Sequence, residues 1–440
     1  MLNSQQLLSN ACRKGTIEVS GTIKKVVGLI IESHGPPAAV GDLCVIRTGG
    51  SDVMTEVVGL RENRVLSMAL GDMHGIKTGA RIELLGQRAG VPVGFGLLGR
   101  TLNGKCEPID DKGPLTGAED RVPLRREGLE PLKRGHIDDP IATGIRSIDG
   151  LVTVGKGQRM GIFSGSGVGK SVLLGTIARN TSADVNVIAL VGERGREVRE
   201  FLDRDLGEEG MKRSVVFVST SDTPAPLKMR AAYAATSVAE FFRDIGLDVM
   251  LMMDSVTRLA MAQREIGLSA GEPPSTRGYP PSVFGMLPQL LERAGKRDGK
   301  GSVTGLYTVL VEGDDLDEPV SDHCRSILDG HVVLRRELAN RGHYPAVDIL
   351  PSRSRVASSV TSKDHQAAAS AFRRIISIHR ENEDLINIGA YKKGSNKEID
   401  YAIGKIGNLN KFLCQQAGDK AEFKKTVESL RLLVADAPDA

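Results

Sequence analysis

The sequence predicts an α/β protein in which a parallel sheet with a phosphate-binding loop lies between a small N-terminal β-barrel and a helical C-terminal domain. Three observations lead to this prediction. From about residue 140 the chain alternates between apolar, strand-like runs and helical patterns, as parallel sheets covered by helices do. Residues 16–84 hold short β-prone runs between Gly-rich turns, and from about residue 361 the chain becomes polar and helical. Because 440 residues exceed one core, we divide the chain into residues 1–84, 85–360 and 361–440.

The N-terminal part is expected to form a closed barrel, because several short strands at this spacing are typical of small barrels. Before them, residues 1–14 are either one or two helical turns or, as we favour, a frayed terminus. The β-prone runs are Ile17–Val19, Ile23–Ile31, Leu43–Ile46, Glu56–Leu60, Val65–Leu70 and Arg81–Leu84.

The middle of the chain begins with a Gly/Pro-rich lead-in, residues 85–135, which we expect to wrap the following sheet. The expected sheet strands are Met160–Phe163, Val185–Val191, Val215–Ser219, Val249–Asp254 and Thr304–Val311. A long Ala-rich helix is expected over Lys228–Arg243, and the C-terminal helices over His365–Asn382, Ile399–Ile406 and Lys420–Ala435.

A phosphate-binding loop is predicted at residues 164–171, Ser-Gly-Ser-Gly-Val-Gly-Lys-Ser, between an apolar strand and a helical pattern. Its glycines let successive backbone N–H groups face the phosphates, and the helix adds its positive end. Lys170 supplies a point charge and Ser171 a hydroxyl for Mg²⁺. Ser164 replaces the usual first glycine, where contact with phosphate is not needed. The nucleotide-binding residues are therefore Gly165, Ser166, Gly167, Val168, Gly169, Lys170 and Ser171.

Hydrolysis of a phosphoanhydride also needs a metal-side acid, an oriented water and a stabilising charge. Asp254 closes a buried-strand run and fits the acid that holds the Mg²⁺ water shell. Glu193 follows another strand directly, where a carboxylate can polarise the attacking water, and Arg194 beside it could contact the γ-phosphate. Arg355 is either a surface arginine or a finger supplied to a neighbouring subunit.

Composition excludes several classes of function. The net charge of +3 argues against a dedicated polyanion binder, and 4% aromatic residues with no Trp leave no base-stacking platform. The five cysteines are scattered without zinc or redox spacing, which fits a reducing compartment. No apolar run approaches the ~20 residues that span a bilayer, and the N-terminus lacks a signal-peptide core. We therefore expect a cytoplasmic protein without a nucleic-acid partner.

Longer motifs resemble the rotary ATPase and type III export ATPase family. The runs Gly278-Tyr-Pro-Pro-Ser-Val-Phe284 and Leu287-Pro-x-Leu-Leu-Glu-Arg-Ala-Gly295 carry this resemblance, together with Pro345-Ala-Val-Asp348. Asp314-Asp-x-x-Glu-Pro319, Ser326-Ile-Leu-Asp-Gly-His331 and Gly192-Glu-Arg-Gly-Arg-Glu-Val198 are similar to the export branch in particular. Two segments resemble the flagellum-specific ATPases within this branch: the phosphate loop and the run Ile388-Gly-Ala-Tyr-Lys-Lys-Gly-Ser395.

The resemblance covers nearly the whole chain and implies a RecA-like core that hydrolyses ATP with Mg²⁺. It implies that Lys170 and Ser171 bind phosphate and Mg²⁺, with Asp254 as the metal-side acid. Glu193 would activate water, with Arg194 and Arg258 near the γ-phosphate. Arg355 would act across the subunit interface. Tyr344 matches an aromatic that stacks on adenine, although a core tyrosine before Pro345 remains the alternative.

The same resemblance implies a homohexameric ring that energises flagellar protein export. Its expected partners are further copies of itself, a regulator, a central stalk protein, the export gate and chaperone-bound substrates, at the inner face of the cell membrane. The loops Ile266–Tyr279 and Asp314–Pro319 would face the stalk. An injectisome ATPase, a catalytic subunit of a rotary ATPase and, remotely, a nucleic-acid translocase remain alternatives.

Overall fold

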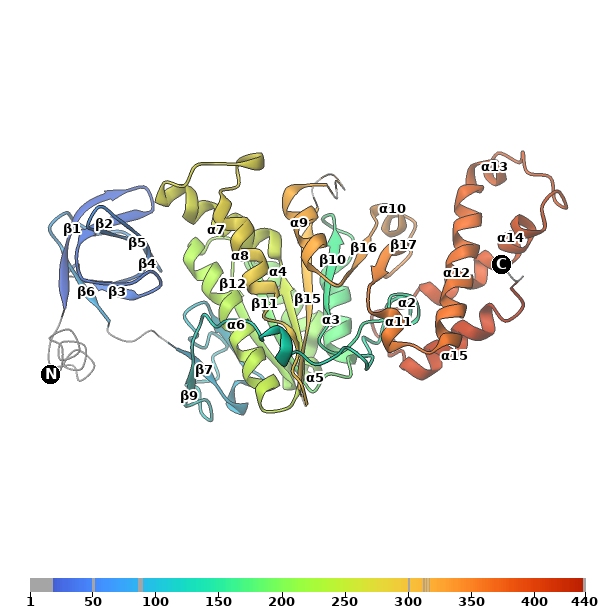
Figure 1. Ribbon diagram of the computed structural model, residues 1–440, viewed down its shortest axis with the longest axis horizontal. Coiled ribbons are helices and arrows are strands. Elements are labelled where there is room, and N and C mark those ends of the chain that lie inside the picture. Colours follow the sequence, from blue (N-terminus) through green and yellow to red (C-terminus); the bar gives the residue numbers. More distant parts are fainter. Residues whose placement is uncertain are drawn as a thin grey trace.

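Three bodies lie in a row in a computed structural model of the protein: a barrel at one end, a sheet-containing domain in the middle and helices at the other end (Figure 1). The structure describes residues 19–49, 52–85, 90–299, 301–311, 313, 315 and 317–437. The predicted fold class is confirmed. No helix within these ranges combines the length and the apolar character that crossing a membrane requires.

The barrel is closed, with its strands in the order β1-β2-β5-β4-β3-β6. Its interior is apolar, and Ile23, Ile46 and Ile82 are fully buried there. The strands are β1 (Ser20–Val27), β2 (Ile30–His34), β3 (Leu43–Ile46), β4 (Val53–Arg61), β5 (Arg64–Ala69) and β6 (Arg81–Leu84).

One barrel strand was predicted wrongly. The run Ile23–Ile31 is divided between β1 and β2, because Gly28 adopts a positive φ of 56° and the chain reverses there. Hydrophobicity alone does not reveal this turn, since Val26, Val27 and Leu29 flank Gly28 closely. Residues 1–14 lie outside the described residues, as does most of Ile17–Val19.

The central sheet has nine strands in the order β17-β16-β10-β15-β13-β11-β12-β8, with β14 (Gly295–Lys296) paired to β15. Neighbours from β16 to β8 are parallel, whereas β17 runs antiparallel to β16. The strands are β8 (Thr101–Asn103), β10 (Arg159–Ser164), β11 (Val185–Val191), β12 (Ser214–Ser219), β13 (Asp248–Asp254), β15 (Ser302–Leu310), β16 (Gly330–Leu334) and β17 (Val347–Ser354).

The five predicted sheet strands are present, but the sequence did not predict β8, β16 or β17 as strands. β8 is three residues long and lies in the lead-in, whose other strands, β7 (Val91–Val93) and β9 (Asp120–Val122), pair with each other. β17 contains Pro351 and several polar residues, a composition tolerated at a sheet edge. β8 and β17 therefore contain no apolar run long enough to predict a strand.

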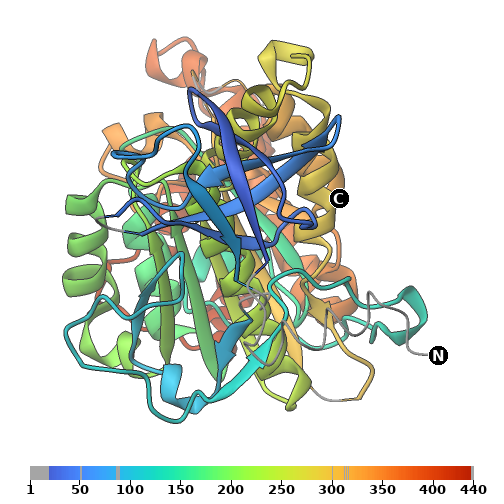
Figure 2. The ribbon, with the colours of Figure 1, turned by 90° about the vertical axis from the view of Figure 1, so that its left-hand side faces the viewer.

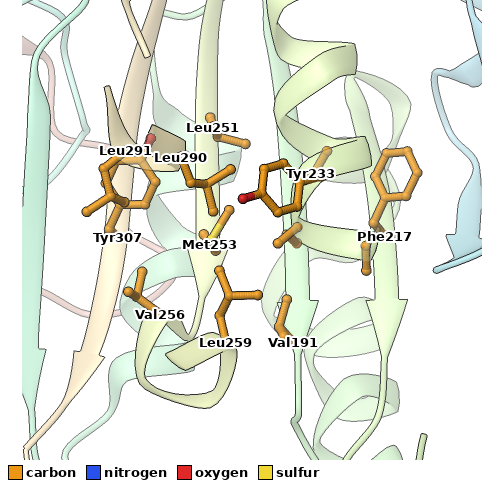
Figure 3. Close-up of a cluster of buried hydrophobic side chains, with 14 of the residues drawn as sticks. Val191, Phe217, Tyr233, Leu251, Met253, Val256, Leu259, Leu290, Leu291 and Tyr307 are labelled. Atoms are coloured by element: carbon orange, nitrogen blue, oxygen red, sulfur yellow. The ribbon is translucent and has the colours of Figure 1, made fainter. Parts of the chain in front are cut away.

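Helices cover both faces of the sheet and complete two hydrophobic cores. On one face α6 packs its alanines closely against β11, β12 and β13, and Figure 3 shows Tyr233 of this helix beside Leu251 and Met253. The helices of this face are α6 (Ala225–Asp244), α7 (Val256–Ala270), α8 (Pro281–Leu291) and α9 (Pro319–Ile327). The other core joins the opposite face of the sheet to the C-terminal helices.

That second core contains α2 (Arg146–Leu151), α3 (Lys170–Asn180), α10 (Arg336–Asn340) and the C-terminal bundle. The predicted C-terminal helices are confirmed as α12, α14 and α15, with a short α13 between the first two. Their bounds are α12 (Lys363–Glu381), α13 (Glu383–Asn387), α14 (Lys397–Leu413) and α15 (Phe423–Leu433). The remaining helices are α4 (Gly195–Glu200), α5 (Gly207–Lys212) and α11 (Ala357–Val360).

The barrel, seen in front of the central domain in Figure 2, contacts that domain through an ion pair and through apolar side chains. Arg230 of α6 pairs with Glu56 of β4 at 3.3 Å, and both side chains are buried. Ile266 of α7 packs against Ile30, Leu66 and Met68 of the barrel. The barrel is thus anchored to the two helices that follow strands β12 and β13.

A buried ion pair joins α6 to the end of α8. Arg293 donates to both carboxylate oxygens of Glu240, at 2.9 and 2.6 Å, and also to Ser237 and to the carbonyl of Leu124 in the lead-in. Replacing Arg293 by Ala is expected to lower the free energy of unfolding by about 3–5 kcal/mol, because Glu240 would remain buried without its main partner. Urea denaturation measures this change.

The double variant Arg293→Met with Glu240→Leu is the matched control. It removes both charges and keeps the volume, so it should recover most of the lost stability. A double variant as unstable as the single one would mean that packing, and not the unpaired charge, causes the loss.

Candidate active site

The phosphate loop connects β10 to α3, at the carboxyl edge of the sheet. Ser164 is the last residue of β10 and is buried, while Ser166 and Gly167 are exposed and Val168 packs into the core below. Gly167 and Gly169 both have positive φ, at 77° and 86°, so these two positions favour glycine. Lys170 and Ser171 are the first residues of α3 and therefore lie at its N-terminal end.

The structure brings together three residues that the sequence predicted from separate strands. The Nζ atom of Lys170 contacts Oδ1 of Asp254 and lies 3.4 Å from Oε1 of Glu193. All three side chains are at most 16% exposed. They meet because β10, β11 and β13 are parallel and end at the same edge of the sheet.

Burial and charge act in opposite directions on this cluster. Burial raises the pKa of Glu193, Lys170 lowers it and Asp254 raises it again, and the outcome is a pKa of about 7 against an ordinary 4.5. Burial alone would lower the pKa of Lys170, but attraction by Asp254 and Glu193 outweighs it and raises that pKa. Glu193 is thus a carboxylate that changes charge near neutral pH, as an efficient general base does.

Thr308 and Arg258 contact the segments that carry Asp254 and Glu193. Thr308 of β15 donates to Oδ1 of Asp254 at 2.7 Å and fixes that carboxylate. Gly192, before Glu193, has a φ of 75°, and a Cβ there would lie 2.8 Å from Cβ of Arg258. The stem of Arg258 in α7 therefore packs over the strand end that carries Glu193, close to the predicted γ-phosphate position.

Arg194 and Arg355 lie outside this cluster. Arg194 is 80% exposed and pairs with Glu197 at 3.5 Å at the start of α4. Arg355 follows β17, and its backbone amide donates to the carbonyl of Asp329. The carboxylate of Asp329 in turn accepts from the backbone amide of Arg159, the first residue of β10. Arg355 therefore lies near the start of β10. Since the loop follows the other end of β10, five residues on, about 17 Å of strand separates Arg355 from its own phosphate loop.

A pocket of about 710 Å³ opens beside the loop. Tyr344 lies over it, with its ring 3.4 Å from where a Cβ on Gly169 would be, and its side chain is about half exposed. The sequence did not point to the turn after α14, which forms another wall. The pocket is lined by Ile145, Gly169, Val172, Leu173, Thr176, Gly342, Tyr344, Pro345, Cys414, Gln415, Gln416, Ala417 and Asp419.

The residues present fit Mg²⁺, which prefers oxygen ligands and keeps several waters. The Asp254 carboxylate and the Ser171 hydroxyl are such donors, and a lysine ammonium lies against the same carboxylate. Among the described residues, no three His, Cys, Asp or Glu side chains form a metal-binding group. This suits an ion held by one carboxylate, one hydroxyl and nucleotide phosphates.

Such a site on a parallel sheet, with a barrel before it and helices after it, defines a nucleotide-binding ATPase of the rotary type. Residues 144–354 match the model of the ATP synthase alpha/beta family nucleotide-binding domain, and residues 23–86 match that family's beta-barrel domain. Residues 361–432 match the C-terminal domain of the type III secretion ATPase EscN.

The chain belongs to the flagellar and type III secretion ATPases. It is 52% identical over 419 residues to the flagellum-specific ATP synthase of Bacillus subtilis, covering 94% of this chain and 95% of the relative. The assembled EscN of enteropathogenic E. coli superposes with a TM-score of 0.89 at 44% identity, over 94% of this chain and all of that one. EscN in complex with its central stalk EscO gives a TM-score of 0.87 at 43% identity, with the same coverage.

The pKa of Glu193 predicts the pH dependence of the reaction. If Glu193 is the general base, it must be ionised to act, so kcat/KM should rise with pH between about 6 and 8 and level off above the pKa of about 7. Stability should change with pH in the opposite direction to kcat/KM. The pKa of Glu193 is higher in the folded protein than in the unfolded chain, so the free energy of unfolding should fall as pH rises from 4.5 through 7. Initial rates and urea denaturation across this range measure the two effects.

Glu193→Gln serves as the control for both measurements, since it cannot titrate. Its unfolding free energy should change less over the same pH range. A wild-type kcat/KM that is flat between pH 6 and 8 would contradict the assignment of Glu193 as the base.

Proposed function

We propose that this protein is a Mg²⁺-dependent ATP hydrolase that works as a homohexameric ring and energises the export of flagellar proteins. The observation that carries the proposal is the cluster of Lys170, Glu193 and Asp254 at one sheet edge together with Arg355 at the other. The cluster supplies phosphate binding, a general base and a metal-side acid. Another subunit would supply Arg355 as the stabilising arginine, because this residue lies far from the phosphate loop of its own chain.

The site residues would act in a defined order. ATP binds with its base beside Tyr344 and its phosphates against the backbone of Gly165–Gly169, and Lys170 moves from the acids to the phosphates. Glu193 orients a water in line with the γ-phosphorus and takes its proton as the new P–O bond forms and the bond to ADP breaks. Arg258 and Arg194 would contact the γ-phosphate, and Arg355 of a neighbouring subunit would stabilise the developing charge.

Ser171 and Asp254 would hold Mg²⁺, which would supply positive charge that stabilises the phosphates during transfer. Thr308 contributes by keeping the Asp254 carboxylate in one orientation. We propose three domains: residues 1–84 with the barrel, residues 85–360 with the site and residues 361–440 with the helical region.

The relatives support the assembly and the partners that we propose. EscN has been described as an assembled ATPase and in complex with a central stalk, so a ring around a stalk protein is expected here. The loop Ile266–Tyr279 would face that stalk; the loop Asp314–Pro319 is described only in part. A regulator, the export gate and chaperone-bound substrates complete the proposed partners, at the inner face of the cell membrane.

One experiment tests the proposal in the native host. Deleting the gene should abolish flagellar filaments, wild-type protein should restore them, and Glu193→Gln should not restore them despite forming rings by native mass spectrometry. Filaments that persist without the gene, together with loss of a host-directed secretion phenotype, would assign the protein to an injectisome instead. Stimulation of the ATPase by single-stranded nucleic acid at physiological salt would favour a translocase.

A further inference from the structure

The turn that follows α14 contains a buried glutamine whose hydrogen bonds all go to protein backbone. Gln415 is 7% exposed although it is polar and lines the pocket beside the phosphate loop. Its Nε2 donates to the carbonyls of Gly144, at 2.8 Å, and Asp419, at 3.1 Å. Its Oε1 accepts from the amide of Arg146 at 3.0 Å.

The same residue holds the loop that carries Tyr344. Its backbone N–H, and not its side chain, donates to the carbonyl of Tyr344 at 2.8 Å. One residue therefore connects three segments that are far apart in the sequence: the start of α2, the segment before β17 and the turn after α14. Each of these segments contributes to the pocket wall.

The turn itself is fixed against the helix that follows the phosphate loop. Arg179 of α3 donates to the carbonyl of Ala417 at 2.7 Å, and Asn180 donates to the carbonyl of Asp419 at 3.3 Å. Within the turn, the amide of Gln416 donates to Oδ2 of Asp419 at 3.1 Å. The C-terminal helical region thus reaches the nucleotide site through a short, hydrogen-bonded segment.

We propose that Gln415 is a positioning residue for the nucleotide base: it holds Tyr344 and the turn 415–419 at the spacing that admits the base. Both Nε2 hydrogens are in use, so this side chain does not donate to the base; it fixes the backbone of residue 415, whose N–H in turn holds the carbonyl of Tyr344. Only an amide suits the position, because a carboxylate would face two carbonyl oxygens. The proposal rests on the proposed function in one respect, namely that this pocket receives the base of ATP.

Binding of two ligands distinguishes a role of Gln415 in binding the nucleotide base from a role in the general stability of the protein. A non-hydrolysable ATP analogue has a base and phosphates, whereas inorganic tripolyphosphate has only the phosphates. Gln415→Met keeps the volume and removes the side-chain hydrogen bonds. We expect its Kd for the analogue to rise about tenfold, in line with the loss of one to two net hydrogen bonds, and its Kd for tripolyphosphate to remain within about twofold of wild type.

In turnover the same variant should show a raised KM with kcat within about threefold of wild type, because the chemistry at Lys170 and Glu193 is untouched. The matched control is His365→Leu. His365 is also buried and bonds the carbonyl of Gly150 at 2.8 Å, so it joins the same two regions away from the pocket. It should change neither Kd.

A double-mutant cycle with Tyr344→Leu tests whether Gln415 acts through the tyrosine: the double variant should bind the analogue no more weakly than the worse single variant. Equal losses for both ligands, an unchanged Kd for the analogue, or additive losses in the cycle would each overturn the proposal. If Gln415→Met does not fold, Gln415→Asn, which keeps an amide of shorter reach, gives the same readout. Binding is measured without turnover, so a wild type that binds the analogue but does not hydrolyse ATP would refute the proposed function alone.

Discussion

Replacing Glu193 by glutamine is expected to lower kcat by about 10²–10⁴-fold while ATP still binds. Glutamine has the same shape but cannot take the proton of the attacking water. It also removes one of the two acids that hold Lys170 in the absence of nucleotide, so binding of phosphate should not weaken. Steady-state rates and the Kd of a non-hydrolysable analogue measure the two quantities.

The control for this variant is Glu200→Gln in α4, seven residues further along. Glu200 pairs with the exposed Arg196 at 3.4 Å and is itself 49% exposed, so its replacement should leave kcat within a few fold. A Glu193→Gln protein that retained more than about a tenth of the wild-type kcat would exclude Glu193 as the general base, since general-base catalysis is worth at least about 10²-fold.

Replacing Arg355 by alanine is expected to lower kcat by about 10³-fold or more, the range found for arginines supplied between subunits. Within one chain this arginine lies at the opposite edge of the sheet from Lys170, where its guanidinium donates to the carbonyl of Arg325 at 3.2 Å. It can reach a phosphate loop only if that loop belongs to another copy. Nucleotide affinity should therefore change far less than kcat.

Mixing two inactive variants tests the shared site directly. Rings assembled from Arg355→Ala chains and Lys170→Ala chains should regain activity, because some interfaces pair an intact loop with an intact arginine. Arg353→Ala, two residues before Arg355 at the end of β17 and exposed, is the matched control and should leave kcat unchanged within a few fold. Mixed rings with only the summed activity of the two separate variants would show that Arg355 does not act across the interface.

The proposed catalytic side chains were predictable as a group because parallel strands bring their carboxyl ends to one edge. Lys170, Glu193 and Asp254 each follow or end an apolar run, so local patterns located them. Thr308 could not be located in this way, because it lies inside β15 and becomes important only through its neighbour β13. Gln415 gave no signal either, since two of its three side-chain partners, Gly144 and Arg146, are more than 260 residues away.

The fold, like the site, was predicted where local sequence patterns define it and missed where tertiary contacts do. The strands rich in Val, Ile and Met were found, whereas β16 and β17 were not, although their residues were recognised as family motifs. The polarity of β17 is explained by its position at the sheet edge. The reversal of β17 is a tertiary property, and it decides that Arg355 lies on the far side of the domain from the loop.

The position of Lys170 has a consequence for the resting enzyme. Its single positive charge lies between two carboxylates, those of Asp254 and Glu193. Attraction to this ammonium group lowers the pKa of Glu193, whereas burial and Asp254 raise it. A nucleotide whose phosphates drew Lys170 away would therefore raise the pKa of Glu193 further, and the ionised base would then depend on the positive charge of the divalent ion that we propose to accompany ATP.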